Sequence, residues 1–199
     1  MLTGTEKDTL RKNLEKYEGK VPHMYLDSKG YVTVGVGHLL GTLADAQKLA
    51  FRNGAKPATK DEIKADYEKV KKQIPDRLAS YYKKYTKLIL PEAEINKLTN
   101  KHIETFEKEL RSIYSGFDTF PPEVRLALFD MIFNLGMTKL RGGWPKFNAV
   151  IKAKDWKKAA DNSKRSPPVS PERNKYVKDL LEKAAKRADM KAKIKKGSR

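Results

Sequence analysis

One stretch of strand-type sequence interrupts a chain whose patterning is otherwise helical, and it restricts the fold more than any other feature. In residues 31–37, valine alternates with Tyr, Thr and Gly, the period of two that is typical of a strand with one buried face. Residues 24–26 provide a partner strand, and the Ser-Lys-Gly of residues 28–30 provides a turn. The segment therefore predicts a β-hairpin with the valines on one face and Thr33 on the other.

Helical patterning covers much of the remaining chain. Residues 5–8 resemble a capping box that opens a helix to about Tyr17, with Gly19 placed to end it. Residues 59–62 form a second capping box for a helix to about Gln73, and Pro91 begins a long helix to about residue 114. Further helices are expected at 77–85, 124–135, 144–152 and 155–162, and from Ser170 onward. The fold class is therefore α+β and mostly α-helical.

The composition excludes several kinds of chemistry. With 199 residues, 39% of them hydrophobic, the chain can bury a core, and the absence of cysteine excludes disulfides, thiolate metal sites and a cysteine nucleophile. Its three histidines lack zinc-binding spacing, so we expect no metal and no cofactor. No run is long and apolar enough for a membrane span, and the N-terminus lacks the apolar stretch of a signal peptide. Carboxylates and hydroxyls remain as the candidate reactive groups.

The charge predicts polyanionic partners. A formal net charge of +18 concentrates anionic wall polymers, anionic lipid or nucleic acid near the surface. Eight Lys and Arg residues against a single Asp lie in residues 183–199, where the simplest interpretation is a solvated helix end that frays. Basic residues elsewhere are mixed with acidic ones and no nucleic-acid motif is present, so we expect no specific nucleic-acid partner.

Three residues near the hairpin could carry hydrolytic chemistry. Glu18 falls at the C-terminal end of the first helix, where the helix dipole should raise the pKa of its carboxyl group, as a general acid requires; the alternative is an ordinary exposed Glu. Asp27 suits the first position of a type I turn, and the same carboxylate could assist water. Thr33 shares its strand face with Gly35 and Gly37, which should leave room for a ligand.

These residues follow the pattern E-G-x7-D-x5-T-x-G-x-G-H-L-L, which closely resembles the catalytic segment of the phage-type lysozymes, an endolysin family assigned to glycoside hydrolase family 24. Weaker similarity continues through residues 87–117, 125–136, 155–162 and 170–173. The resemblance implies a single lysozyme-like domain of two lobes with a small β-hairpin or sheet in the first. The N-terminal lobe would cover about 14–90 and the connecting helix about 91–114. A helical C-terminal lobe of about 115–190 would include the first helix, and 191–199 would form a basic tail.

The resemblance also implies residue roles. Glu18 would be the general acid, Asp27 the second carboxylate, and Thr33 the hydroxyl that helps to hold Asp27 and the attacking water. Three further positions would line the sugar-binding cleft, namely Leu39, Phe133 and Asn162. For Phe133 the competing interpretation is a packing role in an apolar helix.

Two other residues have competing interpretations, and two segments depart from the family pattern. Arg173 matches a cleft arginine of the family but could serve only local packing, and we expect a structural role for His38. Residues 59–85 add helical sequence, an elaboration similar to that of pesticin-like bacterial toxins with this domain. Residues 166–169 lack the aromatic side chain expected in that loop.

The leading hypothesis is a muramidase that cuts the β-1,4 bond between N-acetylmuramic acid and N-acetylglucosamine in bacterial peptidoglycan. The alternative is an inactive wall-binding module of the same fold. We expect a monomer acting in the periplasm or cell wall, released by lysis, a holin or a dedicated secretion system, with anionic wall polymers or outer-membrane lipid as further partners. Phage endolysin, bacteriocin domain and secreted effector stay open, and a toxin would have an immunity protein.

Overall fold

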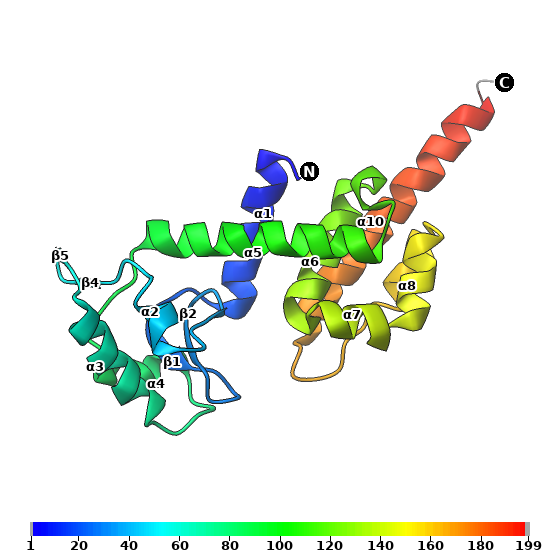
Figure 1. Cartoon of the computed structure of the whole chain (residues 1–199). Coiled ribbons are helices and arrows are strands. Elements are labelled where there is room, and N and C mark those ends of the chain that lie inside the picture. The colour runs from blue at the N-terminus through cyan, green and yellow to red at the C-terminus, as the bar shows by residue number, and fades with distance from the viewer. Residues whose placement is uncertain (1, 198–199) are drawn as a thin grey trace. The chain divides into compact units, whose positions relative to one another are not determined.

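The computed structural model describes residues 2–197, with side chains described to residue 194. It contains two compact units (Figure 1). Residues 11–102 form one unit, and residues up to 10 form the other together with those from 103 onward. Helices α1 (Gly4–Glu18) and α5 (Glu92–Ile113) each contribute residues to both units. The expected α+β, mostly helical class is confirmed.

Helix α1 begins and ends through two local devices. The hydroxyl of Thr3 accepts a hydrogen bond from the N–H of Glu6, and the Glu6 carboxylate accepts one from the N–H of Thr3 at 2.7 Å. The capping box is therefore Thr3 with Glu6, and the prediction that Thr5 opens it was wrong, because the acid pairs with the residue three positions before it. At the other end Gly19 takes a positive φ of 78°, as its expected role in ending the helix requires.

The strand-type segment forms a three-stranded antiparallel sheet in the order β1 (Val21–Leu26), β2 (Val32–Gly35) and β3 (His38–Leu39). The expected hairpin is present as β1 and β2. The second strand stops at Gly35, however, and a turn at residues 36–37 leads back into β3. The predicted single strand over 31–37 was wrong because a positive φ at Gly37 reverses the chain.

The rest of residues 11–102 is built from short elements. Thr59 and Glu62 form the predicted capping box of α3 (Lys60–Lys71), with the Glu62 carboxylate 2.8 Å from the Thr59 nitrogen. The expected helix over 77–85 divides into α4 (Ala79–Tyr82) and the 3-10 helix η1 (Lys83–Tyr85). Three elements too short for a periodic signal were not predicted, namely α2 (Leu43–Ala46), β4 (Arg52–Asn53) and β5 (Lys56–Pro57).

Helices build the other unit. The apolar segment forms α6 (Pro122–Leu135), buried at almost every position from 123 to 132 and ended by Gly136 at φ 75°, as expected. The remaining elements are η2 (Phe117–Thr119), α7 (Met137–Gly143), α8 (Pro145–Lys152), α9 (Trp156–Asp161) and α10 (Pro171–Gly197). Of these helices, η2 and α7 were not predicted. No described helix is long and apolar enough to cross a membrane.

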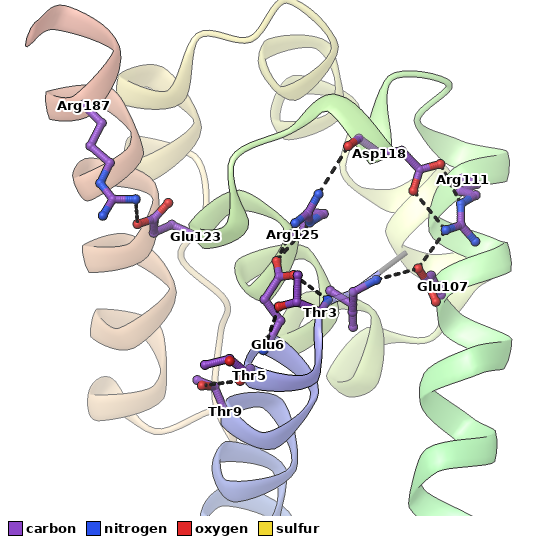
Figure 2. Close-up of polar contacts among 11 residues, drawn as sticks. Thr3, Thr5, Glu6, Thr9, Glu107, Arg111, Asp118, Glu123, Arg125 and Arg187 are labelled. Atoms are coloured by element: carbon purple, nitrogen blue, oxygen red, sulfur yellow. Dashed lines mark hydrogen bonds and ion pairs between the residues drawn. The ribbon is translucent and has the colours of Figure 1, made fainter. Parts of the chain in front are cut away.

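Charged side chains tie the first turn of α1 to α5 and α6 (Figure 2). The Arg125 guanidinium donates to Glu6 at 2.6 Å and, at 3.2 Å, to the backbone carbonyl of Asp118. Arg111 lies between the carboxylates of Glu107 and Asp118, and this guanidinium lowers the pKa of Asp118 to about 2. Both side chains of the Glu6 and Arg125 pair are largely buried, so its hydrogen bonds offset the cost of burying two charges.

The basic C-terminal segment begins as part of the packed structure. Lys183 and Arg187 both pair with Glu123 of α6, whose side chain is 6% exposed, and Figure 2 shows the Arg187 contact. Helix α10 continues to Gly197. The interpretation of residues 183–199 as a fraying end was therefore wrong for its first turns, while residues 198 and 199 lie outside the described residues.

Candidate active site

The three residues singled out for chemistry lie in the same compact unit, residues 11–102. Glu18 is the last residue of α1, Asp27 directly follows β1, and Thr33 lies in β2. Glu18 and Asp27 are half-buried, whereas Thr33 is only 3% exposed. One helix end, one turn and one strand therefore supply the two carboxyl groups and the hydroxyl.

The turn fixes the Asp27 carboxylate. Its Oδ1 accepts hydrogen bonds from the backbone N–H groups of Lys29 and Tyr31, both at 2.9 Å. Gly30 donates its N–H to the Asp27 carbonyl at 3.0 Å, which closes the predicted turn. The described residues give Oδ2 no hydrogen bond. Asp27 is thus a turn former whose second carboxylate oxygen is available to another group.

Thr33 and Asp27 are connected through the backbone of Tyr31. The Thr33 hydroxyl donates to the Tyr31 carbonyl at 3.1 Å, and the N–H of the same residue binds the Asp27 carboxylate. The Asp27 N–H also donates to the Tyr31 carbonyl, at 3.0 Å. The Thr33 hydroxyl therefore supports the turn that orients Asp27.

The expectation of an open, glycine-lined face beside Thr33 was wrong for Gly35. That glycine is buried, and a Cβ added to it would lie 3.2 Å from Cγ2 of Ile95 on α5. The space next to the strand is filled by an isoleucine far along the chain, which no local pattern reveals. Gly37 is exposed and a Cβ there would meet no atom within 4 Å, but it lies in the turn after β2 and not on the strand face of Thr33.

Tyr25 is a site residue that the sequence reasoning missed. It lies opposite Thr33 in the β1 and β2 pairing. Burial, followed by the negative charges of Glu18 and Asp27, raises the pKa of the Tyr25 hydroxyl to about 12. The phenol is therefore neutral near pH 7 and interacts electrostatically with both carboxyl groups. Its position two residues before Asp27, on a strand with period two, was the available signal.

His38 contacts a second histidine. Its Nδ1 lies 2.8 Å from Nε2 of His102 on α5, and the ring centroids are 5.1 Å apart. Burial lowers the pKa of His38, and the facing His102 and Lys101 lower it further. Burial also lowers the pKa of His102, with a smaller contribution from Lys101. A neutral ring pair joining β3 to α5 fits the structural role expected for His38.

The three residues expected to line a sugar cleft fall into different units. Leu39 lies on β3 opposite Thr33 and is 48% exposed, unusual for a leucine. Phe133 of α6 is half-buried, with its ring edge-on to Phe106 at 5.1 Å between centroids. Asn162 ends α9, where its side-chain amide donates to the Lys158 carbonyl at 2.8 Å. Sheet pairing thus brings Leu39 to the carboxylate unit, and the other two belong to the second unit.

Arg173 is a buried member of a charged cluster. Its Nε lies 3.0 Å from Asp130 Oδ2, while Arg165 Nη1 lies 2.7 Å from Oδ1 of the same carboxylate. These contacts fit the local packing considered for Arg173.

The neighbouring loop lacks an aromatic side chain, and Pro167 and Val169 line a cavity of about 570 Å³ there. Among the described residues, no group of three or more His, Asp or Glu side chains could hold a metal ion.

Comparison with known proteins shows similarity in sequence to lysozymes. The phage lysozyme family model matches residues 15–166, which include both carboxyl groups, Thr33, Leu39, Phe133 and Asn162. A protein of Dictyostelium discoideum described as probable T4-type lysozyme 1 is 25% identical over 180 residues, covering 86% of this chain and 92% of that protein. The family match spans well over half of the sequence. The chain therefore belongs to the phage lysozyme family and is a lysozyme-like peptidoglycan hydrolase.

Proposed function

We propose that this protein is a muramidase that hydrolyses the β-1,4 bond between N-acetylmuramic acid and N-acetylglucosamine. The observation that carries the proposal is the placement of Glu18, Asp27 and Thr33 in one compact unit, with Asp27 held by two backbone N–H groups through one oxygen only. Glycosidic hydrolysis needs two carboxyl groups in different roles, one as proton donor and one as base or charge stabiliser. Glu18 and Asp27 supply this pair.

The family pattern and the local hydrogen bonds suggest the roles. Glu18, the last residue of α1, protonates the leaving glycosidic oxygen, as the resemblance to the phage-type lysozymes implies. Asp27, whose Oδ1 is held by two backbone N–H groups, uses Oδ2 to orient a water or to stabilise positive charge at the anomeric carbon. The Thr33 hydroxyl donates to the Tyr31 carbonyl, and the N–H of the same residue donates to Asp27 Oδ1.

Replacing the acid tests this assignment. Glu18→Gln removes the proton donor with little change of shape, so clearing of a purified cell-wall suspension and release of new reducing ends should fall by at least about 100-fold. Glu15→Gln is the matched control, because Glu15 lies one turn earlier on α1 and pairs with Lys20. Mass spectrometry of the muropeptides from both variants identifies the bond that is cut.

The outcomes separate the enzyme from its alternative. Undiminished clearing by Glu18→Gln would contradict the role given to Glu18. Binding of the wild-type protein to walls without any new reducing end would identify an inactive wall-binding module. Products ending in N-acetylglucosamine at the new reducing end would refute a muramidase and indicate another bond.

The stereochemical outcome depends on the separation of the two carboxyl groups. A separation of about 6.5–9.5 Å leaves room for a water and gives inversion, whereas about 5–5.5 Å gives retention through a covalent intermediate. The anomeric configuration of the first product, followed by NMR, distinguishes these routes. The basic surface would add attraction to anionic wall polymers or outer-membrane lipid, and the protein would act as a monomer in the periplasm or wall of the target cell.

A further inference from the structure

The loop of residues 72–78, between α3 and α4, displays aliphatic side chains to solvent. Leu78 is 81% exposed and Ile74 is 61% exposed, and every residue from 74 to 78 is exposed. Burying a large apolar side chain stabilises a protein, and these two side chains make no such contribution within the chain. Two of them within five residues therefore suggest a surface that contacts a partner. The loop lies between the hairpin and α5 in the chain.

Internal contacts hold this loop in place. The buried Tyr82 donates its hydroxyl to the Ile74 carbonyl at 2.8 Å, and the His23 ring contacts the Ala79 carbonyl at 2.9 Å. Pro75 lies beside the turn that follows Asp27: a Cβ added to Gly30 of that turn would be 3.7 Å from the Pro75 side chain. The aliphatic side chains therefore project from an anchored backbone.

Positive charge surrounds the loop. Residues 69–87 carry a single acidic residue, Asp76, and seven exposed basic ones, namely Lys69, Lys71, Lys72, Arg77, Lys83, Lys84 and Lys87. The Lys84 ammonium lies over the rings of Tyr81 and Tyr85, at 4.7 and 5.0 Å from their centroids. Such a border of cations favours a negatively charged partner surface.

We propose that the loop of residues 72–78 docks the protein on an anionic lipid bilayer. Ile74 and Leu78 enter the boundary between headgroups and acyl chains, while the surrounding lysines contact lipid phosphates. A bilayer fits better than an anionic wall polymer, because a solvated polyanion offers the cations a partner but gives the two aliphatic side chains no apolar environment. The tyrosines with Lys84 match the amphipathic side chains that favour membrane interfaces.

Vesicle binding by the full chain tests the proposal. Wild-type protein should co-sediment with vesicles of phosphatidylglycerol and phosphatidylcholine, and far less with phosphatidylcholine alone. The double variant Ile74→Gln with Leu78→Gln keeps the net charge, and its affinity should fall about 10-fold or more because the inserted apolar area is lost. Leu78→Trp should bind at least as tightly as wild type and show a blue-shifted emission when vesicles are added.

A matched control lies on the other unit. Met190 is 57% exposed on the basic α10, so Met190→Gln makes a similar polar change beside lysines and should leave vesicle binding unchanged. Unchanged thermal unfolding midpoints would show that all variants fold. These vesicles contain no peptidoglycan, so the result is independent of the cleavage reaction proposed above.

Three results would overturn the proposal. The first is no binding of wild type to anionic vesicles, and the second is an undiminished affinity of the double Gln variant. The third is a loss of vesicle affinity in Met190→Gln as large as that in the double Gln variant, which would place the membrane contact on α10. If wild type and the double Gln variant both bind purified anionic wall polymer and neither binds vesicles, the protein has a polymer site. That result would also refute docking on a bilayer.

Discussion

At the residue scale, the backbone of a single residue, Tyr31, connects two of the chemically interesting side chains. Tyr31 gives its N–H to Asp27 and receives the Thr33 hydroxyl on its carbonyl. Thr33 is buried and β-branched, so it contributes packing as well as a hydrogen bond. A substitution at Thr33 that keeps the shape of the side chain and removes the hydroxyl can therefore distinguish its structural role from its contribution to hydrolysis.

Thr33→Val should reduce wall hydrolysis more than it reduces stability. The variant keeps the shape but removes the hydrogen bond to Tyr31, which should cost about 1 kcal/mol in the free energy of unfolding. The loss of activity should exceed about 10-fold, because Asp27 is less well oriented. Denaturant unfolding and reducing-end release measure the two effects.

The conservative variant provides the control for this prediction. Thr33→Ser retains the hydroxyl and loses one buried methyl group, so it should keep most of the activity while being somewhat less stable. A Thr33→Val enzyme as active as wild type would show that the hydroxyl has no part in the reaction.

At the element scale, α6 and α10 are joined by a carboxylate between two arginines. The side chains of Asp130 and Arg165 are 3% and 2% exposed, and that of Arg173 is 7% exposed. Removing the Asp130 charge from this cluster takes an ion pair from both buried guanidinium groups at once. This contact therefore governs stability far more than the exposed pairs along α10.

Asp130→Asn should destabilise the protein by roughly 3–5 kcal/mol, because two buried guanidinium groups lose the carboxylate that both of them contact. Asp179→Asn is the control on α10, since its pair with Lys175 is exposed and should contribute less than about 1 kcal/mol. Urea unfolding of both variants measures the difference. Equal effects would show that Asp130 contributes no more than a surface pair.

The His38 and His102 pair, which joins β3 to α5, should make stability depend on pH. Both pKa values are lowered from the ordinary 6.5, by burial first, so the folded state binds protons less readily than the unfolded chain. The stabilising contribution is present above about pH 6.5 and is lost as the pH falls through the folded pKa values. Lys101 acts in the same direction, and Asp45 opposes it at His38.

Unfolding experiments at pH 7 and pH 5 check this expectation. His102→Asn removes one titrating ring and keeps a polar side chain, so the variant should lose less stability between the two pH values than wild type. A parallel decrease in both proteins would assign the pH dependence to other groups.

At the scale of the whole molecule, the net charge of +18 should influence encounter with the wall more than the fold. Lys183 and Arg187 are fixed by Glu123, whereas the described side chains from residue 188 to 194 are exposed on α10. The last nine residues carry five positive charges and no negative one. Deleting the segment after Met190 would therefore remove positive charge without breaking any of the ion pairs described above.

Deleting the residues after Met190 should lower lysis of whole cells at low salt several-fold while sparing soluble wall fragments, because attraction to the anionic envelope weakens. The difference should shrink as salt is added. Equal loss on both substrates would instead indicate a folding role for the segment.

Local features were predictable from the sequence because they depend on neighbouring residues. The Thr59 capping box, the Asp27 turn, the end of α1 at Gly19 and the long α5 all follow from short-range hydrogen bonding and hydrophobic period. The carboxyl pair of the candidate site was found for the same reason, since it lies within ten residues of sequence. Very short elements such as α2 gave no periodic signal.

The sequence by itself determined the class of fold, the main helices and the segment that carries the carboxyl groups, because backbone preference and patterning are local. Only the tertiary structure decided that Ile95 fills the space beside Gly35, that Asp130 lies between two arginines, and that Ile74 and Leu78 are exposed on an anchored loop. These outcomes depend on side chains that meet across long separations in the chain, and their packing is not encoded in the spacing of any one segment.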